Sequence, residues 1–284
     1  MSSTRLTDNE LEAAVPLVVA VARAAAAAVL EEYRRVAAND AGAAAFDKAD
    51  GSPLTTADLR SHATIAAGLE AQFPHIPVIS EEDGGAVVGA VARPAVCWLV
   101  DPLDGTKEFL KRSGEFTVNI AYVEDGVPTM GVVVAPVSGH AWYASPRGAW
   151  REGPDGLVPL GARACPDGLP RCVVASRDHA GDGVRAMLAQ LPAVATIAVG
   201  SSLKFLRIAE GAADLYFRDG PTMAWDTAAA HAVLRGAGGE VFDLAGTPLA
   251  YRAPRATNPA FVAVGDRTLP WPNWVPSTML PAGA

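Results

Sequence analysis

The first apolar segment of the chain, residues 11–30, has the spacing of an amphipathic helix. Its apolar side chains fall on roughly one face, which consists of Leu11, Val15, Val18, Ala22 and Val29. Thr7 and Glu10 form a capping box at its start. The segment is long enough to raise the question of a membrane span. However, Arg23 costs about 2.5–3.5 kcal/mol on insertion scales, and alanine offsets little of that. We therefore expect a soluble helix and no transmembrane segment.

The pattern that follows predicts a loop, a second helix and then a β-rich region. The expected elements are a polar loop over 37–53, a helix from Thr55 or Thr56 to about Phe73, strands at 78–80 and 96–100, and a hairpin of 116–123 and 127–135. The second of these strands leads to Asp101, and we expect Pro102 to end its pairing.

Strands and helices alternate in the second half. The expected strands are 172–175, 213–217 and 261–264, and the expected helices are 184–190, 203–210 and 227–236. This order predicts a mixed α/β fold of two lobes, residues 1–160 and 161–284, which form one structural unit. The acidic positions at the strand ends would meet where the lobes face each other.

Composition narrows the class of protein. The chain has 284 residues, 50% of them hydrophobic, so it can bury a sizeable core. Its formal net charge of -8 argues against binding to nucleic acid. The cysteines, Cys97, Cys165 and Cys172, are too scattered for a disulfide framework or a thiolate zinc site. A reduced, cytoplasmic protein is the simplest interpretation.

The densest chemical signal is the run from Asp101 to Thr106. A buried strand delivers Asp101, Asp104 follows three residues later, and Gly105 and Thr106 add main-chain N–H groups. Hard oxygen ligands beside exposed amides suit a magnesium–phosphate site. For this motif alone, a polar turn with aspartate at turn positions carries about half the weight.

Three further acidic residues lie in separate segments: Asp58, Glu81 and Asp226. Taken singly, Glu81 reads as a solvated turn residue and Asp226 as an N-cap. Together with the Asp101–Thr106 run, however, the segments form four ordered motifs. They are Ser-Pro-Leu-Thr-Thr-Ala-Asp58, Ile-Ser-Glu81-Glu82, Asp101-Pro-Leu-Asp104-Gly-Thr106 and Trp225-Asp226-Thr-Ala-Ala.

Over residues 10–265 the chain resembles the lithium-sensitive, magnesium-dependent phosphatase superfamily that includes inositol monophosphatases. The resemblance implies a layered αβαβα sandwich with the active site between two lobes. A closer likeness, to 3'(2'),5'-bisphosphate nucleotidases of the bacterial CysQ type, rests on longer stretches. These are Trp98 to Phe109, Arg112 to Asn119, Gly200-Ser-Ser-Leu-Lys-Phe205 and Gly220 to Ala229. Inositol monophosphatases typically have Asn-Phe after Asp-Gly-Thr, where this chain has Lys107-Glu108-Phe109.

The resemblance also implies roles for individual residues. The metal ligands would be Glu81, Asp101, the main-chain oxygen of Leu103, Asp104 and Asp226. Asp58 and Thr106 would orient and deprotonate the attacking water. The substrate contacts would be Gly105, Thr106, Lys107, His179, Ser201, Lys204 and Arg218. The implied cofactor is Mg²⁺, two ions with a third near Glu81, and Li⁺ would inhibit.

The implied reaction removes the 3'-phosphate of adenosine 3',5'-bisphosphate to give AMP and phosphate, with 3'-phosphoadenylyl sulfate as a second substrate. A second phosphate that the metals do not neutralise needs cations at a distance, and Lys204 and Arg218 are candidates. Each is also explained as a surface charge, and His179 alone reads more readily as a core-edge histidine. A phosphatase acting on inositol monophosphate or another sugar phosphate remains open, as does an inactive nucleotide-binding relative. The sequence also leaves a homodimer open.

Overall fold

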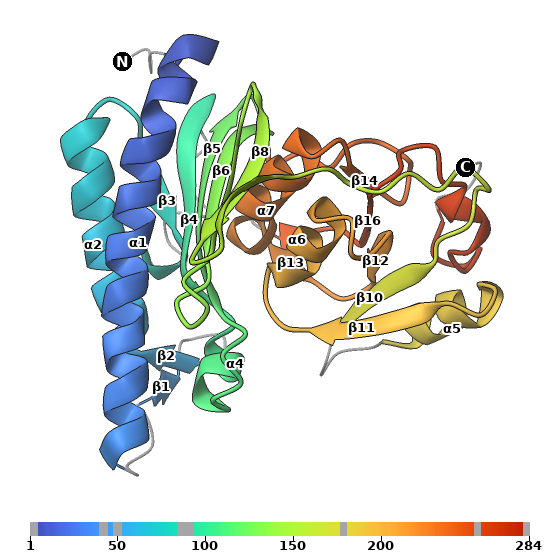
Figure 1. Ribbon diagram of the computed structural model, residues 1–284, viewed down its shortest axis with the longest axis horizontal. Helices are drawn as coiled ribbons and strands as arrows, with labels where there is room; N and C mark the ends of the chain where they lie inside the picture. Colours follow the sequence, from blue (N-terminus) through green and yellow to red (C-terminus); the bar gives the residue numbers. More distant parts are fainter. Residues whose placement is uncertain are drawn as a thin grey trace.

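The larger of two main β-sheets has seven strands (Figure 1). A computed structural model describes residues 5–39, 45–47, 53–83, 94–176, 181–252 and 257–280. The strands are, in spatial order, β3 (Val78–Ser80), β4 (Val96–Asp104), β5 (Thr117–Glu124), β6 (Val127–Val134), β7 (Ala141–Ser145), β8 (Gly148–Gly153) and β9 (Gly156–Pro159). β3 and β4 run parallel, and each later strand is antiparallel to its neighbour. The predicted strands and hairpin of this region are confirmed.

Strand β4 differs from the prediction at Pro102. The strand continues to Asp104, and pairing with β5 resumes at Asp104 and Thr117 after a register shift. The expectation that Pro102 ends the strand is therefore wrong. Proline is tolerated here because the extra residues of a bulge need no ladder hydrogen bond. Asp101 and Asp104 lie at the two ends of the bulge.

Helices α1 (Asp8–Asn39) and α2 (Thr56–Gln72) cover one face of this sheet (Figure 1). The predicted apolar face of α1 is buried in a core shared with β4, β5 and β6. The predicted capping box is present: the main-chain N–H of Thr7 donates to Glu10 Oε2 at 2.8 Å. By length and composition α1 could also cross a membrane, but a single such helix is weak evidence and 44% of its apolar window is buried here. Its burial on the sheet fits the expected soluble helix.

The second main sheet has five strands. In spatial order they are β11 (Ala195–Val199), β10 (Cys172–Ser176), β12 (Leu215–Arg218), β16 (Phe261–Val264) and β14 (Glu240–Asp243). The three predicted strands are confirmed, with β12 displaced by about two residues. β11 and β14 were missed. β11 is an exposed edge strand over most of its length, so it lacks the continuous apolar run of a buried strand.

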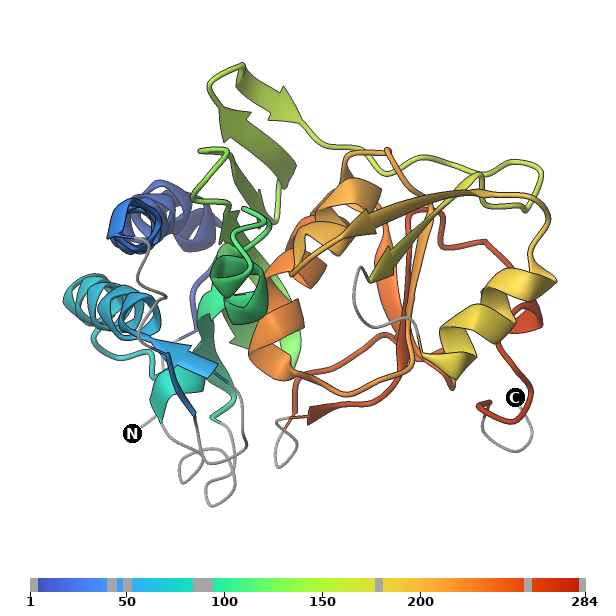
Figure 2. The same ribbon diagram turned by 90° about the horizontal axis from the view of Figure 1, so that it is seen from below.

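Helices α6 (Leu203–Ala209) and α7 (Ala224–Gly236) lie between the two sheets, and α5 (Asp182–Gln190) covers the outer face of the second (Figures 1 and 2). The layers therefore follow the expected αβαβα order, which confirms the predicted mixed α/β class. The predicted lobes, residues 1–160 and 161–284, stay a prediction; they would place one main sheet in each part.

Short elements complete the described fold. They are β1 (Ala45–Asp47), β2 (Pro53–Thr55), η1 (Glu81–Asp83), α4 (Thr106–Leu110), β13 (Thr222–Met223), β15 (Thr257–Asn258) and η2 (Trp271–Asn273). β1 lies within the segment predicted as a loop over 37–53 and pairs antiparallel with β2, of which only Pro53 belongs to that segment. The tryptophan-rich tail, whose role the sequence did not reveal, buries Trp271 and Trp274 against the outer face of the second sheet.

Helix α7 packs closely on β6 at Gly131. A Cβ atom there would lie 2.2 Å from the main-chain oxygen of Ala229, a contact that neither backbone can relieve cheaply. We expect Gly131→Ala to lower the free energy of unfolding by about 1–3 kcal/mol, the range for overpacked cores. Gly161→Ala is the matched control, because a Cβ there meets nothing within 4 Å. Urea denaturation measures both, and equal stabilities would contradict this account of α7.

Candidate active site

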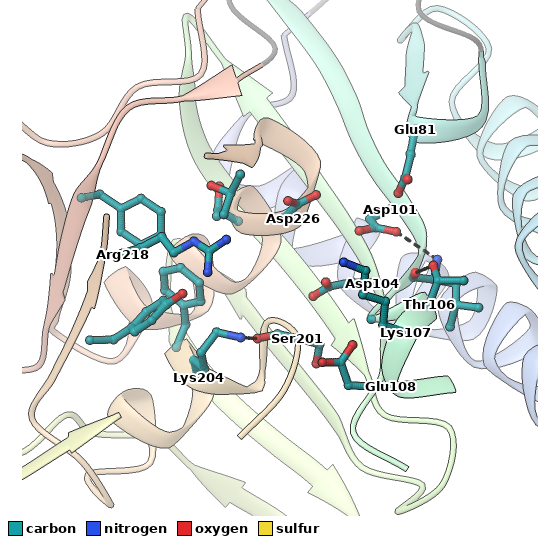
Figure 3. Close-up of a pocket in the computed structure, with 17 residues that line it drawn as sticks. Glu81, Asp101, Asp104, Thr106, Lys107, Glu108, Ser201, Lys204, Arg218 and Asp226 are labelled. Carbon is teal, nitrogen blue, oxygen red and sulfur yellow. Dashed lines mark hydrogen bonds between the residues drawn. The ribbon is translucent and has the colours of Figure 1, made fainter. Parts of the chain in front are cut away.

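Two carboxylates lie where neighbouring parallel strands end. β3 leads directly to Glu81, and β4 carries Asp101 at the start of its bulge. Parallel strands present their carboxyl ends at the same edge of a sheet, so these side chains come close together. Figure 3 shows Glu81 pointing toward Asp101, with Asp104 beside them. Asp101 is 2% exposed.

Asp226 reaches the same place from helix α7. It lies at the third position of α7, where its Oδ2 accepts a hydrogen bond from the main-chain N–H of Met223 at 2.8 Å. Met223 is the N-cap, so the interpretation of Asp226 as an N-cap is wrong. Helix α7 begins at Ala224, three residues before the predicted start at Thr227.

These side chains line one cavity of about 290 Å³. All predicted site residues line it except Asp58 and His179: Glu81, Asp101, Leu103, Asp104, Gly105, Thr106, Lys107, Ser201, Lys204, Arg218 and Asp226. His179 lies outside the described residues, as does Arg177. Figure 3 shows Glu81 and Asp101 on one side of the cavity and Lys204 and Arg218 on the other. The cavity therefore has an acidic end and a basic end.

The acidic end is electrostatically strained in the metal-free protein. Burial raises the pKa of Asp101 well above its usual range, and the charges of Glu81 and Asp104 raise it further. Burial also raises the pKa of Asp226, with a further contribution from Asp104. For Asp104, burial raises the pKa to about 6 although the Lys204 cation opposes the shift. A divalent cation at this end would relieve the repulsion.

The carboxylates of the described structure are not arranged around one point as metal ligands. Among the residues that the structure describes, no three Asp, Glu, His or Cys side chains are arranged to hold a metal ion as they stand. Asp104 and Asp226 are each turned toward a main-chain N–H, from Ser202 at 2.5 Å and from Met223 at 2.8 Å. Both carboxylates accept that hydrogen bond through Oδ2, which leaves Oδ1 able to ligate a metal ion. Four carboxylates and the oxygen of Leu103 are a chemically suitable set for Mg²⁺.

Asp58 lies behind Thr106 rather than in the cavity lining. One carboxylate oxygen, Oδ2, caps helix α2 by accepting from the main-chain N–H of Thr55 at 2.8 Å. The other, Oδ1, lies 3.3 Å from the hydroxyl of Thr106, which is also 3.3 Å from the main-chain oxygen of Leu103. Thr106 is therefore the group that can connect Asp58 to the cavity.

The basic end is built around α6 and β12. Lys204 is nine-tenths buried, donates to the main-chain oxygen of Ser201 at 2.5 Å, and lies over the ring of Tyr216. Arg218 donates to the main-chain oxygens of Gly220 and Pro221, both at 3.2 Å. The hydroxyl of Ser201 is buried and makes no hydrogen bond among the described residues. Two cations and a free hydroxyl are suited to an anionic group.

Sequence reasoning missed six residues of the lining, namely Glu108, Phe205, Tyr216, Thr222, Thr227 and Phe261. Glu108, Phe205, Thr222 and Thr227 lie within the stretches that carry the likeness to the nucleotidases, so a closer reading could have found them. The three aromatic residues come from three separate elements, and Tyr216 and Phe261 gave no local signal. Their rings pack together only in the fold, with Phe205 and Tyr216 centroids 5.4 Å apart.

The raised carboxylate pKa values predict a pH-dependent response to Mg²⁺. Below pH 6 Asp104 is largely protonated in the folded protein, and a proton competes with the metal. We expect the Mg²⁺-induced rise in Tm to be small near pH 5 and to grow as the pH passes about 6 toward 7. Thermal unfolding with EDTA and with excess Mg²⁺ at each pH measures the difference.

Without metal, the raised pKa of Asp104 makes the folded protein less stable as the pH rises. The folded pKa of Asp104 lies above the unfolded value of about 3.9, so its stabilising contribution is present below that value and is lost as the pH rises through about 6. Taking the difference between the two curves removes other groups, such as His231, whose pKa burial lowers. A Mg²⁺ effect that falls with rising pH would contradict this prediction.

Comparisons with known proteins agree with one another. Residues 10–268 match the model of the inositol monophosphatase family. The 3'(2'),5'-bisphosphate nucleotidase CysQ of Escherichia coli is 46% identical over 245 residues, which cover 85% of this chain and 95% of that protein. The CysQ structure from Bacteroides thetaiotaomicron, a bacterial member of the same family, superposes with a TM-score of 0.75 at 36% identity and covers 89% of this chain and 97% of its own. An inositol monophosphatase from Thermotoga maritima, at 22% identity and a TM-score of 0.70, shares the fold.

Proposed function

Because this chain belongs to the inositol monophosphatase family, we propose from its relatives and its cavity that it is a 3'(2'),5'-bisphosphate nucleotidase. It hydrolyses the 3'-phosphate of adenosine 3',5'-bisphosphate and leaves AMP. Relatives that carry this name are 46% identical over most of the chain. The observation that carries the proposal is the division of one cavity into an acidic and a basic end, since the substrate has two phosphates that need different partners.

At the acidic end, we propose that Glu81, Asp101 and the main-chain oxygen of Leu103 hold one Mg²⁺ and that Asp101, Asp104 and Asp226 hold a second. A third, weaker ion would lie near Glu81, and Li⁺ would inhibit by replacing one Mg²⁺. Bound there, Mg²⁺ supplies positive charge for the phosphoryl oxygens and makes water acidic enough to act as a nucleophile near neutral pH. The raised pKa values of Asp101 and Asp226 support this assignment, because a bound cation would stabilise buried carboxylates that lie beside one another.

Asp58 and Thr106 position the attacking water. The hydroxyl of Thr106 donates toward Asp58 Oδ1 at 3.3 Å, which turns a lone pair of its oxygen outward as an acceptor. A proton taken from water by Thr106 can then pass to Asp58, since the two groups are already connected. Gly105, Thr106 and Lys107 line the cavity where the transferred phosphoryl group would lie.

At the basic end, Ser201, Lys204 and Arg218 bind the 5'-phosphate. Burial lowers the pKa of Lys204, but the nearby Asp104 charge opposes that shift. A buried cation paired with a phosphate gains more than an exposed one, because the low local dielectric strengthens the interaction. His179 remains a proposed contact of the same phosphate, from the resemblance alone. The larger substrate 3'-phosphoadenylyl sulfate is proposed as a second substrate of the same site.

A phosphate-release panel in excess Mg²⁺ tests the proposal. It compares adenosine 3',5'-bisphosphate, inositol 1-phosphate and fructose 1,6-bisphosphate. We expect kcat/KM for the nucleotide to exceed the others by at least about tenfold. Inositol 1-phosphate has no second phosphate for the basic end, and fructose 1,6-bisphosphate holds its two phosphates at a different spacing and has no nucleoside. A preference for inositol 1-phosphate would identify a sugar-phosphate phosphatase, and no release from any of them would identify a non-catalytic relative.

A cytoplasmic location is also proposed. Cys97, Cys165 and Cys172 are buried free thiols, as expected for a protein in a reducing compartment.

A further inference from the structure

Two segments that are far apart in the sequence meet beside Asp104. One is the start of β5 and the residues before it, 115–119, and the other is the loop 200–204 that leads into α6. The main-chain N–H of Gly200 donates to Glu115 Oε2 at 2.9 Å. Both segments carry sequence signatures of the nucleotidases, but neither Thr117, Asn119 nor Ser202 has a role in the reaction proposed above.

Ser202 is the centre of this contact. Its hydroxyl lies 2.8 Å from the hydroxyl of Thr117 and donates to Asn119 Oδ1 at 3.1 Å. The three side chains are at most 1% exposed. Buried polar groups that satisfy one another in this way hold a unique arrangement, since breaking one bond leaves its partner buried and unpaired. We call Thr117, Asn119 and Ser202 the Ser202 cluster.

The cluster holds a carboxylate of the acidic end. The main-chain N–H of Ser202 donates to Asp104 Oδ2 at 2.5 Å, and Asn119 Nδ2 lies 3.3 Å from the same oxygen. With Oδ2 held by these donors, the orientation of Asp104 is fixed from both lobes. The carboxylate therefore cannot turn without disturbing the loop that contains Ser202.

The same loop carries the basic end. Ser201 has φ of 47°, a left-handed conformation that is unfavourable for a residue with a side chain. Such strain persists only where the surroundings determine the backbone. The bonds of Ser202 and Gly200, on either side of Ser201, provide that determination. They set where the hydroxyl of Ser201 and the ammonium of Lys204 lie.

We infer that Ser202, held by Thr117 and Asn119, is a positioning residue that fixes Asp104 and the loop of Ser201 and Lys204 relative to each other. Binding of a divalent cation at the acidic end is thereby coupled to binding of a nucleotide phosphate at the basic end. The nucleotide half of this inference rests on the proposed function, whereas the effect on Asp104 does not. Coupling of this kind is reciprocal, so each ligand tightens the binding of the other by the same factor.

The test uses Ser202→Ala and Thr117→Val in the full chain, with Mg²⁺ titrated calorimetrically in the absence and presence of saturating AMP. We expect each variant to bind Mg²⁺ about fivefold more weakly than wild type, the factor that corresponds to one lost hydrogen bond. AMP should tighten Mg²⁺ binding to the wild type, and this gain should shrink to less than about twofold in the variants.

Two controls separate positioning from general damage. Ser145→Ala removes a buried hydroxyl on β7 that accepts from the main-chain N–H of Arg147, and Thr129→Val removes one on β6 that has no hydrogen-bond partner in the described structure. Neither residue lines the cavity. Both controls should keep the Mg²⁺ affinity and the AMP effect of the wild type.

Wild-type Mg²⁺ affinity in both Ser202→Ala and Thr117→Val would overturn the inference, as would a wild-type protein whose Mg²⁺ affinity is unaffected by AMP. Thr117→Val nearly preserves the side-chain volume, so it keeps the test decisive if Ser202→Ala fails to fold. The outcome is independent of turnover. A protein that hydrolyses no bisphosphate would refute the proposed function, while the Mg²⁺ titration without AMP still decides the role of Ser202 toward Asp104.

Discussion

Asp101→Asn is expected to yield a folded protein that has lost at least about a thousandfold in kcat at saturating Mg²⁺. Metal ions supply several kcal/mol of charge stabilisation to such reactions, and each 1.36 kcal/mol is about tenfold in rate. Asparagine has nearly the shape of aspartate, so the new side chain still fits the buried position of Asp101. Phosphate release from adenosine 3',5'-bisphosphate measures the loss.

The stability of this variant distinguishes a metal ligand from a structural carboxylate. Burial and the charges of Glu81 and Asp104 disfavour the ionised form of Asp101, so a neutral side chain there should give Asp101→Asn a Tm in EDTA equal to or above that of the wild type. Asp214→Asn is the matched contrast. Asp214 is fully buried but bound by Arg163 at 2.7 Å and by two main-chain N–H groups.

Burial alone would raise the pKa of Asp214, but its bond to Arg163 and the main-chain donors lower it. We therefore expect Asp214→Asn to lower Tm while its folded fraction keeps the Mg²⁺ dependence of the wild type. Near-normal kcat in Asp101→Asn would count against the metal assignment of this residue.

Arg218→Ala is expected to reduce kcat/KM for adenosine 3',5'-bisphosphate by about 10- to 100-fold, the range for a lost hydrogen bond to a charged group. Adenosine 3'-monophosphate, which lacks the 5'-phosphate, should be hydrolysed by the variant and the wild type at similar rates. The comparison isolates the second phosphate, because the two substrates differ in nothing else.

Arg252→Ala controls for the loss of one positive charge. Arg252 is exposed, contacts the main-chain oxygen of Asp125 and does not line the cavity. It should leave both substrates unaffected. Equal losses on the two substrates in Arg218→Ala would remove the basis for a nucleotidase and favour a sugar-phosphate phosphatase.

An acidic protein can thus bind a doubly phosphorylated substrate. The net charge of -8 excluded a broad nucleic-acid surface, and it is compatible with a small anion because the charges are segregated within one cavity. Carboxylates that repel a phosphate become its binding site once cations lie between them. Lys204 and Arg218, which line the other end, are proposed to bind phosphate without such cations.

Local signals placed Glu81 after a strand and Asp101 after a buried run. They did not group the acidic end, because Glu81 and Asp226 taken singly read as a turn residue and an N-cap; the four ordered motifs and the resemblance brought them together. Hydrophobic periodicity likewise identified the buried face of α1, because that face packs on a sheet along its whole length. The path of the backbone at Pro102 was harder to predict from the sequence. Pro102 lies in a bulge, and a bulge depends on the partner strand rather than on the proline.

Other features depend on contacts between distant segments. The closeness of Thr117 and Asn119 to Ser202 follows from the way the N-terminal end of α6 meets the start of β5, and no spacing within either segment reveals it. The aromatic lining of the basic end has the same origin. Strand β11 was missed for a different reason, since an exposed edge strand does not need the apolar residues by which strands are recognised.

Diffraction from crystals soaked in Mn²⁺, recorded at the manganese absorption edge, tests the metal site most directly. The account predicts anomalous peaks in the cavity, with one ion ligated by Asp101 and Glu81 and another by Asp101, Asp104 and Asp226. Crystals that bind Mn²⁺ only elsewhere, or that show no peak beside Asp101 at saturating Mn²⁺ and neutral pH, would contradict it.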